Sequence, residues 1–218
     1  MPNDPFNKVD TVTCTIDRRL ARSRPTDVES TRAMVAAVDA RDPNTRVHSL
    51  SVAHYAVAIG RRMGLPAAEV ETLRKAALLH DVGKIGIPDA ILLKPGPLTP
   101  DEFEKVKRHP EIAVEILGHL SDLAEQLPII LHHHEHFDGR GYPSGLAGEG
   151  IPIGARILAV ADALDTMFSQ RTYKQAYSAD RVRAELIAGS GRQFDPAVIQ
   201  ATLSLLYKPP SLGHQWLS

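Results

Sequence analysis

The sequence predicts an all-α fold, a bundle of about eight to ten helices with one irregular glycine-rich loop. Apolar residues recur at three- and four-residue steps along most of the chain, which is typical of amphipathic helices. Helix-start signals recur too, and no convincing pair of strands is evident. The one stretch rich in turn residues, 138-DGRGYPSGLAGEGIP-152, contains five glycines and is long for a connection, so we interpret it as a functional loop.

The segment 48–64 is the first with a clear helical stripe. Its apolar positions run from Val52 through Ile59 at helical spacing, and His48 lies on that stripe. His54 faces away from the stripe. The two histidines are therefore expected to have different roles.

Further helices are predicted from their composition and start signals. Thr99, followed by Pro100 and Glu102, indicates a capping box with proline at the first helical position. The others are an apolar helix over 72–80, a helix over 155–168 that is apolar nearly all round, a helix over 179–189 that follows Ser178, and a helix that starts at Asp195-Pro196.

The bulk composition excludes several classes of function. The formal net charge is -1 with a pI near 6.8, which argues against a nucleic acid polymer as partner. No apolar run approaches the roughly 20 residues that a membrane span needs, and the N-terminus lacks a signal-peptide pattern. The single cysteine, Cys14, cannot form an intrachain disulfide. These features predict a cytoplasmic protein without a membrane span.

Two polar clusters interrupt this pattern, 80-HDVGKIGIP-88 and 132-HHHEHFDGRGYP-143. His80 and Asp81 follow an apolar helix, where an ionised carboxylate needs a cation or several donors. We expect the backbone to leave helical geometry at Gly83 and to let both side chains reach one cation. Each cluster also has an alternative explanation without a metal. The first could be a surface ion pair, and the second a solvated polar loop.

Three isolated residues fit the same metal hypothesis: His48, His109 and Asp162. For each alone, a hydrogen-bonded core or capping residue is the more ordinary explanation. Together, neutral imidazole nitrogens and carboxylate oxygens suit iron, manganese, nickel or zinc. The lack of thiolate ligands argues against a structural zinc site.

In their order and separations, these motifs resemble the HD-GYP family, a bacterial branch of the HD-domain phosphohydrolases. The resemblance covers residues 28–208, so that residues 1–27 are interpreted as a leader or the remnant of an N-terminal module, and residues 209–218 as a C-terminal tail. It also includes the segments 171-RTYK-174 and 194-FDP-196. The resemblance implies an HD-domain helical bundle that binds two or three metal ions, often iron or manganese. The implied metal ligands are His48, His80, Asp81, His109, His133, His134 and Asp162.

The resemblance also implies hydrolysis of the bacterial second messenger cyclic di-GMP to the linear dinucleotide, to GMP, or to both. Asp81 would be shared by two cations that activate a bridging hydroxide. The implied catalytic residues are Asp81 and Lys84, and the implied substrate-binding residues are Lys84, Arg140, Tyr142, Arg171 and Lys174. For Arg140 a solvated position in the loop is an equal alternative, and for Tyr142 a structural turn is another.

One position departs from the pattern of the three-metal members of the family. Those members resemble one another in having a glutamate four residues before the first histidine, where this chain has Asn44. An amide is a poorer metal ligand than a carboxylate. We therefore expect a binuclear site, with a third metal in doubt.

Two rival functions stay open at this point. One is an HD phosphohydrolase that acts on another cyclic dinucleotide or nucleotide, which the DGRGYP segment disfavours. The other is a signalling or adaptor module with little turnover. Besides a cyclic dinucleotide substrate, three kinds of partner stay open for this protein: a separate sensor or receiver module, another signalling protein, or a second copy in a homodimer.

Overall fold

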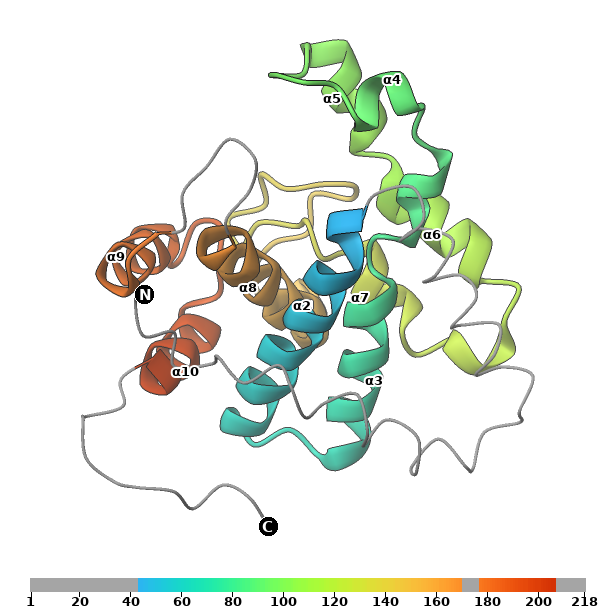
Figure 1. Cartoon of the computed structure of the whole chain (residues 1–218). Coiled ribbons are helices and arrows are strands. Elements are labelled where there is room, and N and C mark those ends of the chain that lie inside the picture. The colour runs from blue at the N-terminus through green and yellow to red at the C-terminus, as the bar shows by residue number, and fades with distance from the viewer. Residues whose placement is uncertain (1–42, 170–176, 207–218) are drawn as a thin grey trace.

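The computed structural model describes residues 43–169 and 177–206, with side chains from residue 47 onward, and over these ranges the fold is all-α (Figure 1). Within them the regular elements are α-helices and short 3-10 turns, and the one β-type bridge there joins Ser190 and Phe194. The predicted fold class is confirmed.

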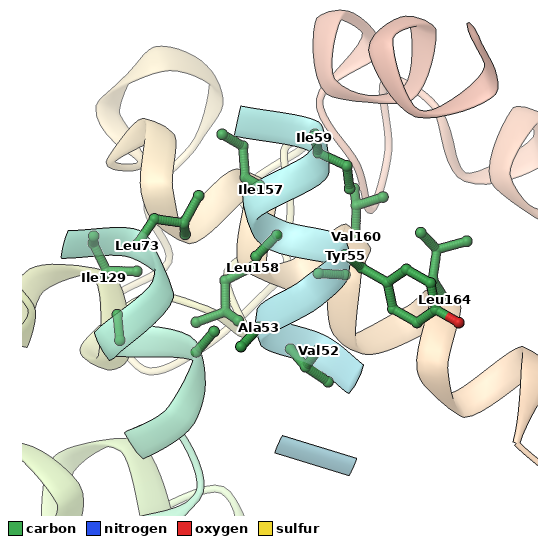
Figure 2. Packing of buried hydrophobic residues seen from close by; sticks show 14 of the residues in the cluster. Val52, Ala53, Tyr55, Ile59, Leu73, Ile129, Ile157, Leu158, Val160 and Leu164 are labelled. Atoms are coloured by element: carbon green, nitrogen blue, oxygen red, sulfur yellow. The ribbon is translucent and has the colours of Figure 1, made fainter. Parts of the chain in front are cut away.

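Helix α2 (Pro43–Arg62) lies in the middle of the bundle and packs against α3 (Ala67–Leu79) and α8 (Ile153–Phe168) (Figure 1). Its apolar stripe explains this position, because Val52 is fully buried and belongs to one core cluster with residues of α3 and α8, such as Leu73 and Leu158 (Figure 2). Burial of one such side chain contributes about 1.5 to 3 kcal/mol. His54 is exposed on the other face, as the helical period predicted.

Helix α8 is buried on most of its surface, as its composition predicted. Ile157, Leu158 and Val160 are successive or nearly successive along the chain, and all three are 0% exposed. The helix starts at Ile153, two residues earlier than predicted. Its N-cap residue is Pro152, which makes no side-chain cap, so no polar signal marks the start.

The helix starts predicted from capping residues are confirmed, whereas the apolar helix predicted over 72–80 is longer at its N-terminal end and is α3 (Ala67–Leu79). The Thr99 hydroxyl accepts a hydrogen bond from the Glu102 N–H at 3.3 Å, and the Thr99 N–H donates to the Glu102 carboxylate at 2.7 Å. This capping box begins α5 (Pro100–Val106). In a similar way, the side chains of Ser178 and Asp195 accept hydrogen bonds at the starts of α9 (Ala179–Gly189) and α10 (Pro196–Leu206).

The remaining elements follow the C-terminal end of α3 along the chain. Helix α5 and its neighbour α4 (Asp89–Leu92) project from the body of the bundle (Figure 1), and α5 buries none of its side chains. The other elements that follow α3 in the chain, as far as α7, are η2 (Val82–Gly86), α6 (His109–Leu117), η3 (Ser121–Leu123) and α7 (Leu127–Leu131). Of these, α6 packs against η2 and α7.

The glycine-rich loop over 138–152 is tied to the turn between α9 and α10. The Asp138 N–H donates to the carbonyl of Arg192 at 2.8 Å, and a short 3-10 turn, η4 (Gly148–Gly150), closes the loop. The Arg156 guanidinium on α8 joins the loop to this turn, because it donates to the carbonyl of Ile151 at 2.9 Å and to the Asp195 carboxylate at 2.6 Å. These bonds give the loop a defined place against the bundle.

Several predictions lie outside the described residues. They concern the leader over 1–27, the tail over 209–218, and the side chains of Asn44, Arg171 and Lys174. Among the described helices, none combines the length and the apolar character needed to cross a bilayer. The cytoplasmic location stays a prediction.

Candidate metal centre

The seven predicted ligands come together at one place, although they come from distant parts of the chain. Their donor atoms form three groups, and within each group the atoms lie within 4.8 Å of one another. The groups are His109, His133 and His134; His48, His80 and Asp162; and His80, Asp81 and His133. Because the groups share members, they describe one continuous centre with room for more than one cation.

Three of the histidines are oriented by the same local bond. In each, ring atom Nδ1 lies against the backbone carbonyl three residues earlier. A carbonyl only accepts, so Nδ1 holds the proton and Nε2 is left with a lone pair. The pairs are His80 with Ala77 at 2.8 Å, His109 with Val106 at 2.8 Å, and His133 with Ile130 at 2.6 Å. Such bonds fix the tautomer of metal-ligating histidines.

The Nε2 atoms of His109 and His133 then face one another, and neither carries a proton. Nε2 of His109 and Nε2 of His133 are 3.5 Å apart, and both residues are 1% exposed. Two lone pairs at this separation repel unless a cation lies between them. The donor set therefore fits a divalent metal ion, which imidazole nitrogens and carboxylate oxygens bind well.

Burial keeps these imidazoles neutral. It lowers the pKa of His109, lowers that of His133 well below its usual value, and lowers that of His134 to about 3, with nearby imidazoles adding to the effect. Histidine binds a metal only in its neutral form. At neutral pH these three side chains are ready to bind without first losing a proton.

Asp81 lies between the groups and is almost fully buried, at 4% exposed. Its Oδ2 is 2.7 Å from Nζ of Lys84 and 3.5 Å from Nε2 of His80, whereas its Oδ1 faces Nε2 of His109 at 3.7 Å. Burial raises the pKa of Asp81, but His80, Lys84, His109 and His48 outweigh it and hold the pKa well below its usual value. Asp81 is thus an ionised carboxylate whose two oxygens face different ligands.

The prediction that Gly83 is where the backbone leaves helical geometry was wrong. Helix α3 already ends at Leu79, and Asp81 leaves helical geometry with φ -95° and ψ 1°, so convergence does not depend on Gly83. Gly83 serves a different purpose, because a Cβ on it would lie 1.9 Å from the carbonyl oxygen of His109. The missing side chain lets η2 touch the backbone of α6.

Asp165 is a site residue that sequence reasoning missed. Its Oδ2 accepts a hydrogen bond from Nδ1 of His48 at 2.6 Å, which leaves Nε2 of His48 facing Asp162 at 3.3 Å. Burial lowers the pKa of His48, but the bond to Asp165 and the charges of Asp162, Asp81 and Asp165 together raise it. The available signal was a second aspartate one turn after Asp162 in an otherwise apolar helix.

Replacing Asp165 with alanine should weaken metal binding about 10- to 100-fold, because His48 loses the group that orients it. Asp165→Asn retains an acceptor oxygen and should lose less. Metal affinity is measured by competition with a chelator, and Asp180→Ala, at an exposed position on α9, is the control. Unchanged affinity in Asp165→Ala would mean that packing alone orients His48.

The glycine loop forms one wall of the centre. The Tyr142 ring stacks on the His134 ring, with centroids 4.9 Å apart and an interplanar angle of 28°. Burial and the charges of Asp162 and Asp81 raise the pKa of Tyr142, so its hydroxyl stays protonated and available as a donor. The predicted wall residue Tyr142 thus lies beside the predicted ligands.

Glu135 holds this wall in place. Its carboxylate is buried and accepts a hydrogen bond from the Ser144 N–H at 2.7 Å. The loop lies directly on the Glu135 backbone, since a Cβ at Gly141 would be 2.4 Å from the Cα of Glu135. His132 also faces Glu135, with Nδ1 at 3.5 Å from its Oε1, and is in none of the three candidate ligand groups.

The other predicted substrate contacts differ in placement. Lys84 is beside Asp81, as expected from the sequence. The Arg140 side chain is 81% exposed, and its nearest recorded partner is the Asp138 carboxylate at 3.9 Å. The structure therefore brings Lys84 and Tyr142 to the centre and leaves Arg140 in solvent, where contact with a substrate stays a prediction.

Comparison with known proteins agrees with this architecture. The family profile described as HD domain matches residues 20–198. The chain is 45% identical over 177 residues to the cyclic di-GMP phosphodiesterase response regulator RpfG of Xanthomonas campestris pv. campestris, covering 80% of this chain and 47% of that protein. It is 39% identical over 184 residues to 3'3'-cGAMP-specific phosphodiesterase 2 of Vibrio cholerae, covering 83% of this chain and 35% of that protein.

A solved structure has the same fold. It is Bd1817, an HDG"Y"P protein from Bdellovibrio bacteriovorus, with a TM-score of 0.59 at 22% identity over 75% of this chain and 53% of that one. The chain spans about half the length, or less, of the curated relatives named above.

Proposed function

Since the chain belongs to the HD-domain family, in its HD-GYP branch, we propose that it is a metal-dependent phosphodiesterase that hydrolyses cyclic di-GMP. One observation supports this most directly: buried, neutral imidazoles and the ionised Asp81 face one another within 4.8 Å. The resemblance to cyclic dinucleotide phosphodiesterases supplies the substrate class.

The proposed roles follow from the geometry. When bound, two divalent cations, iron or manganese in preference to nickel or zinc, supply a water of lowered pKa and offset the charge of the phosphate. Asp81 presents Oδ2 towards His80 and Oδ1 towards His109. Lys84, with Nζ at 2.7 Å from Asp81, keeps a positive charge where the phosphate enters, and Tyr142 offers a hydroxyl donor from the loop.

We propose a binuclear centre in which the third donor group, His80, Asp81 and His133, links the other two. His109, His133 and His134 would hold one cation, His48, His80 and Asp162 the other, with Asp81 between them. Asn44 lies one helical turn before His48 on α2 and offers only an amide. A carboxylate at that position would add a ligand for a third ion.

Asn44→Glu should therefore raise the metal count above two per chain, or raise the affinity for an additional ion. Elemental analysis of anaerobically prepared protein measures the count, and Asn44→Gln, which keeps an amide, serves as the control. Three fully occupied sites in the unaltered protein would contradict the binuclear proposal.

The activity is tested by incubating protein loaded with iron or manganese with cyclic di-GMP and separating the products by chromatography. We expect the linear dinucleotide, GMP, or both, and we expect a chelator to stop the reaction. Fully metal-loaded protein that leaves cyclic di-GMP intact would refute the proposal and leave two alternatives, hydrolysis of another cyclic dinucleotide and a signalling or adaptor module.

Arg171 and Lys174 are proposed to grip the phosphate or guanine of the substrate. If they lie outside the metal ligands, their replacement by alanine should leave metal content and thermal stability nearly unchanged. Turnover of cyclic di-GMP should fall roughly tenfold to a hundredfold per residue, for a charged hydrogen bond of about 1.5 to 3 kcal/mol. Hydrolysis of methyl p-nitrophenyl phosphate, a much smaller diester, should fall far less, and equal losses would contradict this role.

A hybrid cyclic dinucleotide is the second candidate substrate. It is favoured by the 39% identity to a relative that is named as specific for 3'3'-cGAMP. The ratio of kcat/KM for cyclic di-GMP and 3'3'-cGAMP decides between them.

A further inference from the structure

A row of side chains leads from the metal centre to an exposed aromatic ring on α5. It starts at His134, whose ring is stacked under Tyr142 with centroids 4.9 Å apart. Nζ of Lys107 lies 5.7 Å from the centroid of the Tyr142 ring and 5.7 Å from that of the Phe103 ring. Tyr142, Lys107 and Phe103 therefore form one continuous surface, which we name the rim.

Packing of the hydrophobic core does not explain why the rim residues are held together. Phe103 is 48% exposed, and α5 buries none of its side chains, so this ring does not contribute to the core. Lys107 pairs with Glu104 at 2.6 Å, but the Glu104 side chain is 66% exposed, so that this pair contributes little to stability. An ammonium group and an aromatic face are thus held side by side, two residues before the ligand His109.

The proposed substrate has a part that the metal centre cannot contact. A cyclic dinucleotide carries two phosphates on opposite sides of its ring and two purine bases. When one phosphate is at the metals, the second phosphate and its base must extend outwards. Purines stack on aromatic side chains at about 1 to 3 kcal/mol per base, and an ammonium group offsets phosphate charge.

We propose that the rim is a subsite for the half of the cyclic dinucleotide that is not being cut, with a purine on Phe103 and its phosphate at Lys107. Lys107 would then exchange Glu104 for the phosphate, while Tyr142 connects the two halves of the site. The inference rests on the proposed function and extends it to the determinants of substrate size.

The test compares Phe103→Ala and Lys107→Gln with two controls. Lys105→Gln removes an exposed charge from the same helix, and Ile187→Ala removes a side chain that is 59% exposed on α9. We expect KM for cyclic di-GMP to rise about tenfold in each rim variant, which is the size of one stacking contact for Phe103→Ala and of one charged hydrogen bond for Lys107→Gln. Metal content, hydrolysis of methyl p-nitrophenyl phosphate and both controls should stay within about twofold of the unaltered protein.

Equal losses on the large and small substrates, or no loss on either, would overturn the subsite. Binding of the slowly cut bis-phosphorothioate analogue of cyclic di-GMP separates this failure from failure of the proposed function. If the rim variants bind the analogue as tightly as the unaltered protein, the subsite is wrong whatever the turnover. If they bind it more weakly while the unaltered protein fails to cut cyclic di-GMP, the subsite holds and the proposed catalysis is wrong.

Discussion

Replacement of Asp81 by alanine is expected to abolish turnover and to deplete the bound metal. The carboxylate is buried and ionised, and its two oxygens face His80 and His109. No other carboxylate contacts His109 in the described part of the chain. Its loss should reduce kcat/KM by about a thousandfold or more, which corresponds to about 4 kcal/mol of transition-state stabilisation. Turnover assays and elemental analysis measure the two effects.

His54→Ala is the matched control for Asp81→Ala. His54 is a histidine on α2 like His48, but its side chain is exposed on the opposite face of the helix. Its replacement should leave metal content and turnover unchanged. If the two variants behaved alike, assignment of ligands by helical face would have failed.

The sequence predicted best those features that depend on local periodicity. The stripe on α2 separated His48 from His54, and the apolar character of α8 placed Asp162 in a buried helix. Both follow from the 3.6-residue repeat, which is visible in the sequence. The resemblance to HD-GYP proteins added the remaining candidates, which the structure brings together.

Other features depend on how helices and loops pack in three dimensions and were not visible in the sequence. Asp165 contacts His48 only because α8 packs beside α2, so its partner is 117 residues away. Glu135 appeared to be part of a polar run, yet it anchors Ser144 because the backbone at Gly141 approaches so closely. In both cases the function of a carboxylate is set by a tertiary contact that no spacing rule contains.

Gly83 shows the same limit of prediction from sequence, and its replacement is the second change for which we expect a large effect. Its expected role came from the backbone freedom of glycine, whereas the structure uses its small size. A Cβ on this residue would lie 1.9 Å from the carbonyl oxygen and 2.9 Å from the carbonyl carbon of His109, and 2.6 Å from the backbone nitrogen of Ala113. These are backbone atoms of α6, so the contact can be relieved only by moving η2 away from α6.

Gly83→Ala should therefore reduce the free energy of unfolding by about 3 kcal/mol, the upper range for overpacking. It should also weaken metal binding, because Gly83 lies between Asp81 and Lys84 and presses on the residue that supplies the His109 ligand. Denaturant unfolding and elemental analysis measure the two effects.

Gly150→Ala is the control, because a Cβ there meets nothing within 4 Å and the backbone does not have a positive φ. That variant should be neutral or more stable by about 0.4 to 1 kcal/mol, through a less flexible unfolded chain. Equal stability of the two variants would show that η2 and α6 are not in the close contact that brings Asp81 to His109.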